Sequence, residues 1–327
     1  MLRSYGAAGD RLKLLSESST DIPRDAIWID ALAPTEDERR AIEAACNVSL
    51  PTVEDMIEIE ESSRLYLENG ALNMTLVLPI RADTPDPAKT EVAFVLTRER
   101  LITLRPHDPR PFQTFAARCT TEPGTRMSSD LVMIGLAETA VDRLADLMQK
   151  VDRELDTVGR RIFKDTEQKR ERGANAEREL AVILKRIGRT NRLESMVRDA
   201  LLSMARMVPF LRQQTAAWAQ PESMGRMETL QRDIRSLSDY DAQINQEVTF
   251  LLDATLGLIS IRQNGIIKVL SLAAVVFLPP TIVASIYGMN FQFMPELYWD
   301  WGYPLAIVLM LVASVGTYWF FRWRGWL

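Results

Sequence analysis

The residues best suited to handling a metal ion form a short run, Tyr287-Gly288-Met289-Asn290, within a long uncharged stretch. Gly288 allows a turn and close packing, and Asn290 supplies a neutral carbonyl oxygen. A ring of such oxygens from several copies could accept hydrogen bonds from the waters of a hydrated dication. This chemistry suits Mg²⁺, because Mg²⁺ dehydrates reluctantly and usually keeps several waters. The run therefore predicts recognition of a hydrated cation.

Helical spacing places further small and polar residues on the face that carries Asn290. Such residues let helices approach closely in a membrane, so this face can be a packing stripe. It can also line a pore between symmetry copies, with apolar constrictions at Leu278 and Ile267 and polar rings at Thr281 and Asn264. Both interpretations stay open from the spacing alone. Counting back in threes and fours gives Gly288, Ser285, Thr281, Leu278, Ala274, Ser271, Ile267, Asn264, Ser260, Gly257 and Asp253.

Two adjacent prolines, Pro279 and Pro280, lie in the middle of this uncharged stretch. Each proline ring removes a backbone donor and loosens the helix. The carbonyls left open must then be satisfied by a neighbour or by water in a lumen. The pair predicts a kink, or a point of gating.

The charges of the chain are unevenly distributed. The 327 residues include 39 Lys and Arg and 44 Asp and Glu, but the last 62 positions hold few of them. Stretches 269–295 and 301–321 are uncharged, and roughly 20 apolar residues suffice to cross a membrane. We therefore expect two transmembrane helices. The charges in this part are Lys268, Glu296, Asp300, Arg322 and Arg324.

The flanking residues predict the orientation of the two spans. Lys268 precedes the first span and Arg322 and Arg324 follow the second, whereas the connecting loop carries only acidic charges, so both termini should be cytoplasmic. Tyr and Trp residues gather at both predicted membrane surfaces, as interfacial belts do. These aromatic residues are Tyr298, Trp299, Trp301 and Tyr303 at the outer end, and Trp319, Trp323 and Trp326 at the inner end.

The charge balance and the cysteines exclude several classes of protein. A net charge of −5 with intermixed signs argues against nucleic-acid binding. Cys46 and Cys119 indicate neither a disulfide framework nor a thiolate zinc site. There is no Gly-rich phosphate loop, Gly-x-Ser-x-Gly or HExxH motif, and His107 is the only histidine. We therefore do not expect an enzyme, and the roles of these three residues stay open.

Residues 1–125 are predicted to form a cytosolic α/β domain. Short apolar runs predict strands near 11–15, 26–29, 64–68, 72–80, 91–96 and 100–104. Thr35 and Glu38 have the spacing of a capping box and predict a helix to about Cys46, and Thr52 begins another.

Helical periodicity continues through the rest of the chain. We expect a long antiparallel hairpin over 126–221, built from helices at 129–172 and 176–218 with a break at Arg172-Gly173-Ala174-Asn175. A stalk helix and first span should cover 222–290, followed by a periplasmic loop (291–302), a second span (303–321) and a basic cytosolic C-terminus (322–327). The overall class is an α+β membrane protein.

The stalk helix predicts self-association. About 65 residues at 1.5 Å each make a rod of roughly 95 Å with an apolar stripe that it cannot bury alone. Since the chain offers no other helix of matching length, copies of the same chain are the expected partners. The stripe consists of Leu230, Ile234, Leu237, Ile244, Val248, Leu251 and Leu258.

The motifs together resemble the CorA family of magnesium and cobalt channels. The similarity is strongest over about 250–327, and the order of α/β domain, hairpin and stalk extends it over the whole chain. It rests on Tyr287-Gly288-Met289-Asn290, Met294-Pro295-Glu296-Leu297, Gly302-Tyr303-Pro304, Gln263-Asn264, Phe277-Leu278-Pro279-Pro280-Thr281 and the terminal Trp326-Leu327.

The resemblance implies a funnel-shaped homopentamer in the bacterial inner membrane that passes Mg²⁺, and also Co²⁺ or Ni²⁺. The first span lines the pore and cytosolic Mg²⁺ at subunit interfaces holds the channel closed, so Mg²⁺ is both transported and regulatory and no organic cofactor is expected. Asp233 on the stalk is the candidate regulatory ligand. The implied residues are Gly288, Met289 and Asn290 in the filter; Asp253, Asn264, Ile267, Ala274, Leu278, Thr281 and Ser285 along the pore and gate; Glu296 and Asp300 in the outer loop; and Lys268, Arg322 and Arg324 in a basic collar.

Two other functions remain open at this point. A zinc transporter of the ZntB type shares the Gly-Met-Asn run and the architecture, although the Met-Pro-Glu-Leu loop favours CorA. A membrane-tethered signalling or scaffold protein would need spans only as an anchor. Such an anchor requires neither the small and polar face nor Asn290 at its outer end.

Overall fold

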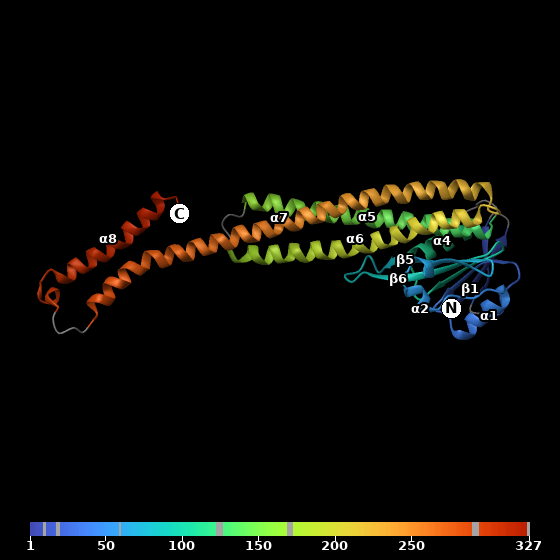
Figure 1. The fold of residues 1–327 in the computed structure, drawn as a ribbon, viewed down its shortest axis with the longest axis horizontal. Helices are drawn as coiled ribbons and strands as arrows, with labels where there is room; N and C mark the ends of the chain where they lie inside the picture. Colours follow the sequence, from blue (N-terminus) through green and yellow to red (C-terminus); the bar gives the residue numbers. More distant parts are fainter. Residues whose placement is uncertain are drawn as a thin grey trace. The chain divides into compact units, whose positions relative to one another are not determined.

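The computed structural model describes residues 1–8, 11–17, 20–58, 60–121, 127–168, 173–289 and 294–325. These residues form two compact units, Met1–Leu252 and Asp253–Leu327, which we call the first and second units. The first unit contains a sheet and several helices, and the second contains the end of one long helix and a further helix (Figure 1).

The first unit is built on a seven-stranded sheet with the strand order β2-β1-β3-β7-β6-β5-β4. Strands β3 and β7 pair in parallel, with Trp28 opposite Leu101 in the register, and the other described pairs are antiparallel. The strands are β1 (Leu2–Ala8), β2 (Arg11–Glu17), β3 (Ala26–Leu32), β4 (Leu65–Glu68), β5 (Ala71–Ile80), β6 (Ala88–Leu96) and β7 (Leu101–Arg105).

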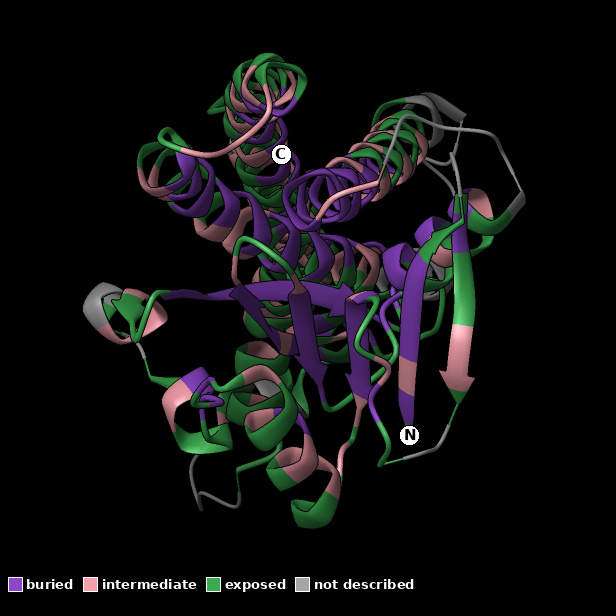
Figure 2. Ribbon diagram, turned by 90° about the vertical axis from the view of Figure 1, so that its right-hand side faces the viewer, coloured by how far each residue is buried: buried purple, intermediate pink, exposed green. Residues whose placement is uncertain are grey.

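Helices cover both faces of this sheet (Figure 2). On one face, Ile42 of α1 (Glu36–Cys46) and Met56 of α2 (Val53–Ile57) join a core with Ile29 and Ile102. On the other face, Phe115 of α4 (Arg110–Thr121) packs edge-on against Trp28. The alternation of side chains along β3 sends Trp28 and Ile29 to opposite faces. The short helix α3 (Glu61–Arg64) leads into β4.

The expected α/β domain is confirmed, with two local differences. Thr35 and Thr52 both form capping boxes, at the starts of α1 and α2. Strand β1 and helix α4 were not predicted. The β1 sequence has no β-branched residue, and its strand character comes from pairing with both β2 and β3. Helix α4 begins with Arg110-Pro111, and the proline occupies the first turn, where its missing N–H costs nothing.

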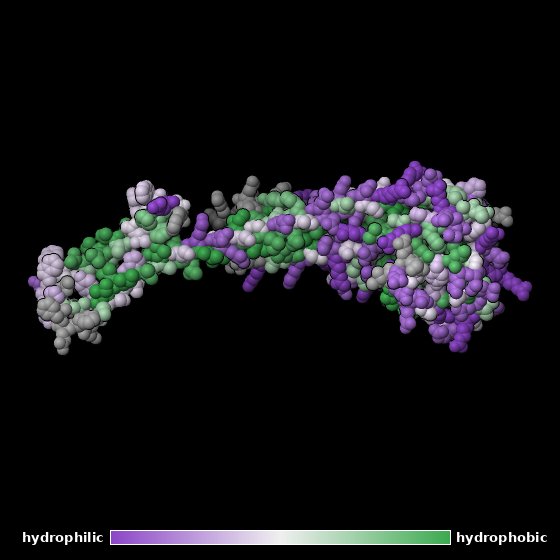
Figure 3. Space-filling view, viewed as in Figure 1, coloured by the Kyte–Doolittle hydropathy of each residue, from purple (hydrophilic) through white to green (hydrophobic). Residues whose placement is uncertain are grey.

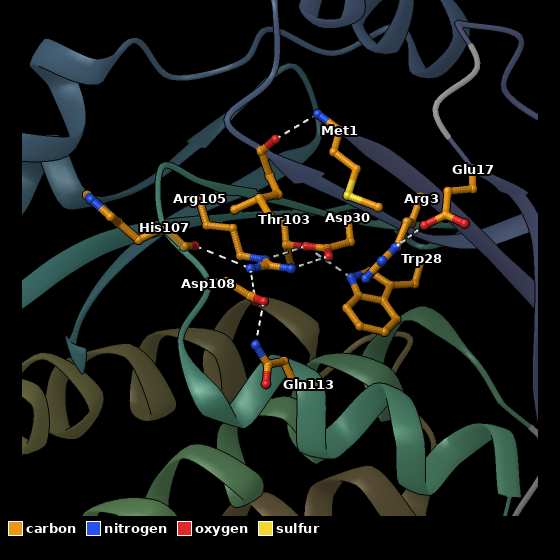
Figure 4. Close-up of polar contacts among 11 residues, drawn as sticks. Met1, Arg3, Glu17, Trp28, Asp30, Thr103, Arg105, His107, Asp108 and Gln113 are labelled. Carbon is orange, nitrogen blue, oxygen red and sulfur yellow. Dashed lines mark hydrogen bonds and ion pairs between the residues drawn. The ribbon is translucent and has the colours of Figure 1, made fainter. Parts of the chain in front are cut away.

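A buried ion pair connects the two central parallel strands (Figure 4). Arg105 of β7 donates from Nε and Nη2 to the Asp30 carboxylate of β3 at 2.8 and 2.7 Å, and both residues are 3% exposed. Thr103 donates to the same carboxylate at 2.8 Å and accepts from Trp28 Nε1 at 3.0 Å. Burial alone would lower the pKa of Arg105, but Asp30 and Asp108 raise it above its ordinary value.

Three long helices complete the first unit: α5 (Ser129–Gln168), α6 (Gly173–Thr215) and α7 (Pro221–Tyr287), which also enters the second unit. The expected long helices are confirmed, but α6 already begins at Gly173, so Gly173-Ala174-Asn175 is helical rather than a break. Residue 172 lies outside the described residues. Pro221 occupies the first helical position of α7, where its fixed φ favours initiation.

The expectation that copies of the chain cover the stalk stripe is wrong over the first unit. Helices α5 and α6 of the same chain lie along α7. These two shorter helices together cover the apolar stripe that a helix of matching length was expected to cover. Arg226 of α7 pairs with Glu138 of α5, and Asp241 of α7 accepts from Arg198 Nε of α6 at 2.8 Å. The buried residues of this stripe are Leu230, Ile234, Ile244, Val248 and Leu251, and Met227, which precedes the stripe, is buried as well.

We predict that Arg105→Met destabilises the protein by about 3–5 kcal/mol, because it leaves the Asp30 carboxylate buried without its cation. Thermal unfolding of the detergent-solubilised protein measures the loss. The matched control is Arg110→Met, which removes an exposed partner of Asp83 and should cost less than about 1 kcal/mol. Equal losses in the two variants would contradict the central role of the buried pair.

Candidate ion path in the second unit

The second unit carries the two candidate membrane helices. Their most apolar windows have mean hydropathies of 2.2 in α7 and 1.9 in α8 (Gly302–Trp323), and 0% and 6% of these windows are buried within the chain. The apolar surface is visible over both helices in Figure 3. A core helix of a soluble protein would be mostly buried, so this exposure favours a lipid environment.

One face of α7 is partly covered in this unit, and α8 is the helix that meets it. Ser314 of α8 donates a hydrogen bond from Oγ to the carbonyl oxygen of Val276 at 3.2 Å. Small residues on α8 allow this approach, as is typical of helix pairs in membranes. The half-buried residues of α7 are Leu272, Val275, Val276, Pro279, Pro280, Val283 and Tyr287, and the covered residues of α8 are Gly302, Ala306, Met310, Ala313, Ser314, Thr317 and Phe321.

The contact between Ser314 and Val276 follows from the double proline. In an α-helix the carbonyl of residue 276 accepts from the N–H of residue 280, but Pro280 has none. The hydroxyl of Ser314 supplies the missing donor. In a lipid environment an unpaired carbonyl is costly, so this hydrogen bond stabilises the packing of α8 on α7.

The opposite face of α7 is left uncovered in the single chain. At about 100° per residue, Ala274, Leu278 and Ser285 lie roughly half a turn from Val276 and Val283. Leu278 is 63% exposed and Ile267 59% exposed. The sequence-predicted residues Asp253, Asn264, Ala274, Thr281, Ser285, Gly288 and Met289 are also exposed. The packing of α8 therefore does not use the small and polar face.

The end of α7 constrains Gly288. Its N–H donates to the carbonyl of Ala284 at 2.9 Å, and a Cβ added at Gly288 would lie 3.2 Å from that oxygen. Such a contact is tighter than most side chains make, so the absence of a side chain keeps this last turn regular. Asn290 lies outside the described residues, and its role as a filter ligand stays a prediction.

The charges predicted for the collar and the outer loop lie outside the uncharged stretches 269–295 and 301–321. Lys268, Arg322, Arg324 and Asp300 are exposed. Arg322 Nη1 lies 3.4 Å from the Tyr318 hydroxyl, where it donates. Glu296 belongs to a short 3₁₀ helix (Pro295–Tyr298), and its side chain lies outside the described part of the chain. The basic collar and the acidic outer loop stay predictions.

Asp233 lies in the first unit, exposed on α7. The sequence did not identify a partner for it, and the structure brings it near Asp142 of α5. Burial raises the pKa of Asp142, Arg118 lowers it, and the charges of Glu138, Asp146 and Asp233 raise it further. Within the described ranges, no group of three or more His, Cys, Asp or Glu side chains is arranged to hold a metal ion.

Comparisons with known proteins agree with one another. The family model described as CorA-like Mg²⁺ transporter protein matches residues 24–323. Proteins named magnesium transport protein CorA from Pasteurella multocida and Salmonella typhimurium are each 32% identical, and the match covers all of both chains.

Solved structures show the same fold. The complete CorA magnesium transporter of Methanocaldococcus jannaschii has a TM-score of 0.73 at 17% identity, over 100% of this chain and 99% of that one. The ZntB cytoplasmic domain of Vibrio parahaemolyticus has a TM-score of 0.53 at 11% identity, over 79% of this chain and 97% of that domain.

We predict that Ser314→Ala weakens the packing of α8 on α7 by about 0.5–2 kcal/mol, because the Val276 carbonyl loses its donor. Unfolding of the protein in mixed micelles measures the change. In a Pro280→Ala background residue 280 regains its N–H, so the same Ser314→Ala change should cost little. An equal cost in both backgrounds would rule out this explanation.

Proposed function

This chain belongs to the CorA family of Mg²⁺ transporters, and from this premise we propose that it forms a homopentameric channel in which α7 lines the ion path. The number of copies follows the resemblance of the motifs to the family. We further propose that Co²⁺ and Ni²⁺ also pass, that the protein lies in the bacterial inner membrane, and that both termini are cytoplasmic. Two positive charges per ion make the membrane potential worth about 4.6 kcal/mol per 100 mV.

The uncovered face of α7 is the observation that carries this proposal. In a single chain, α8 packs against one face of α7. The opposite face of α7 is therefore available to contact other copies of the chain or water. Here that other face holds Asn264 on one side, and Thr281 and Ser285 on the other side, of the stretch bounded by the apolar residues Ile267 and Leu278. Purely lipid-facing surfaces have no need of hydroxyl and amide groups, whereas a narrow aqueous path does.

Each segment of this face has a proposed role. Gly288, Met289 and Asn290 form the outer filter, where amide oxygens accept hydrogen bonds from the water shell of the ion. Leu278 and Ile267 form the gate, which blocks hydrated ions by excluding water. The remaining rings come from Asp253 at the cytosolic mouth, Asn264, Ala274, Thr281 and Ser285.

Charged residues near the two ends of the ion path have proposed roles as well. Glu296 and Asp300 raise the cation concentration at the outer entrance through the field of ten carboxylates per pentamer. Lys268, Arg322 and Arg324 form a basic collar at the inner membrane face.

Regulation by cytosolic Mg²⁺ is proposed at Asp233. Carboxylates of Asp233 and Asp142 repel one another when no ion is present, and a dication between such groups removes the repulsion. An ion that binds only the closed arrangement would shift the population toward it. Ligands from a neighbouring subunit would complete the site.

Uptake into proteoliposomes tests the proposed function against the zinc alternative. We expect Mg²⁺ uptake that follows the membrane potential and needs no pH gradient. Zn²⁺ uptake that depends on a proton gradient, without Mg²⁺ uptake, would favour a ZntB-type transporter instead. The ZntB domain likeness is weaker than the full-length CorA matches, which is why Mg²⁺ is the expected ion.

We predict that Asn290→Ala abolishes Mg²⁺ uptake, because the filter loses the oxygens that hold the hydrated ion. The particle size of the purified variant should equal that of the unmodified protein. Undiminished uptake by a correctly assembled variant would remove Asn290 from the filter.

We predict that Leu278→Gly produces a leak when cytosolic Mg²⁺ is high, since the gate loses its apolar bulk. The matched control is Phe277→Gly, one position along and about 100° around the helix. It carries the same glycine cost and removes a side chain that is 70% exposed. A tighter pore in Leu278→Gly, or an equal leak in both variants, would contradict the gate.

A further inference from the structure

Two acidic residues are buried together between α6 and α7 in the first unit. Glu194 of α6 is 2% exposed and Asp241 of α7 is 5% exposed. Buried carboxylates are rare unless they are paired, and here two of them meet a single cation, Arg198, which is itself about one third exposed. If both were ionised, the cluster would carry a net negative charge away from water.

The hydrogen bonds of this cluster leave two oxygens open. Arg198 donates from Nε to Asp241 Oδ2 at 2.8 Å and from Nη2 to Glu194 Oε1. The amide of Asn245 lies beside the same groups, and with its oxygen toward Arg198 it accepts from Nη1 at 3.1 Å. The other carboxylate oxygens, Glu194 Oε2 and Asp241 Oδ1, are buried with no hydrogen-bond partner.

One proton on the cluster would remove its net negative charge and would also supply a hydrogen-bond donor for the unpaired carboxylate oxygens. A protonated Glu194 becomes a donor, neutralises one of the two charges, and can bond to the open oxygen of Asp241. We propose that Glu194 and Asp241 share one proton at neutral pH, and that this proton fastens α7 to α6. A dication is a poorer occupant, because the Arg198 guanidinium already contacts both carboxylates and repels it.

The surroundings of Glu194 support this assignment. Burial raises the pKa of Glu194, the charge of Asp241 raises it further, and Arg198 lowers it only in part. Several charged groups described on the neighbouring elements have partners of their own. They are Asp152 of α5 with Tyr240, Glu154 of α5 with Arg186, and Lys89 of β6 with Asp199.

The shared proton makes the α6–α7 contact sensitive to pH. Because the pKa of Glu194 is higher in the folded protein than in the unfolded chain, the stabilisation is fully present below the unfolded pKa of about 4.3. It is lost as the pH rises through the folded pKa. Alkaline conditions therefore place two adjacent negative charges between the helices and loosen α7, the helix that continues to Tyr287.

Infrared spectroscopy of the full-length protein tests the proposal directly. The unmodified protein at pH 7 should show the carbonyl stretch of a buried protonated carboxyl group, which disappears as the pH rises. Glu194→Gln should remove this band, and so should Asp241→Asn, which gives Glu194 an amide donor in place of the shared proton. Absence of the band from the unmodified protein would overturn the proposal without any variant.

Thermal unfolding supplies the second measurement. Going from acid to alkaline pH should lower the unfolding temperature of the unmodified protein. This decrease should be larger, by about 2–4 °C or more, than the decrease for Glu194→Gln, whose amide cannot ionise. The matched control is Asp199→Asn on α6, which removes an exposed pair with Lys89 and should keep both the band and the pH response. A pH response in Glu194→Gln equal to that of the unmodified protein would also overturn the proposal.

Discussion

The hydrogen bond that replaces the missing donor of Pro280 is the constraint on which the second unit depends. A helix in lipid must satisfy its own carbonyls, and the double proline prevents α7 from doing so at Val276. Ser314 of α8 provides the donor at 3.2 Å. Once α8 is fixed there, the face with Leu278, Thr281 and Ser285 remains free, and the proposed ion path follows from that arrangement.

The surroundings of α7 differ between the first and the second unit. In the first unit, α7 buries an apolar stripe against α5 and α6 and is tied to them by Glu138, Asp130, Arg198 and the Glu194–Asp241 cluster. In the second unit its surface is apolar on nearly every side, apart from the small and polar face.

Much of this arrangement could be predicted from the sequence, because the signals were local. The capping boxes at Thr35 and Thr52, the start of α7 at Pro221 and the two apolar helices depend on neighbouring residues alone. Strand β1 and the partners of the stalk stripe depend on contacts between distant segments, which composition does not reveal. Helix α4 was not predicted, although Pro111 lies in its first turn, where a proline is tolerated.

In the candidate ion path, too, the sequence predicted the features that depend on neighbouring residues but not those that depend on contacts between distant segments. Periodicity identified the small and polar face of α7, but it left packing and pore lining equally open, since small residues serve both. The small residues of α8, Ala306, Ala313, Ser314 and Thr317, lie on one helical face, at spacings of seven from Ala306 to Ala313 and of three and four before Thr317. They could have indicated which helix supplies the packing stripe. Asp142 had no sequence signal, because only the fold brings it near Asp233.

Cysteine accessibility along α7 tests the central claim most directly. In a variant with Cys46 and Cys119 replaced by serine, single cysteines at positions 276, 281, 283 and 285 would be exposed to a membrane-impermeant thiol reagent during Mg²⁺ uptake into proteoliposomes. We expect the reagent to block uptake for cysteines at 281 and 285, which lie on the uncovered face, and to have no effect at 276 and 283, which face α8. Block at 276 and 283 with none at 281 and 285 would contradict it.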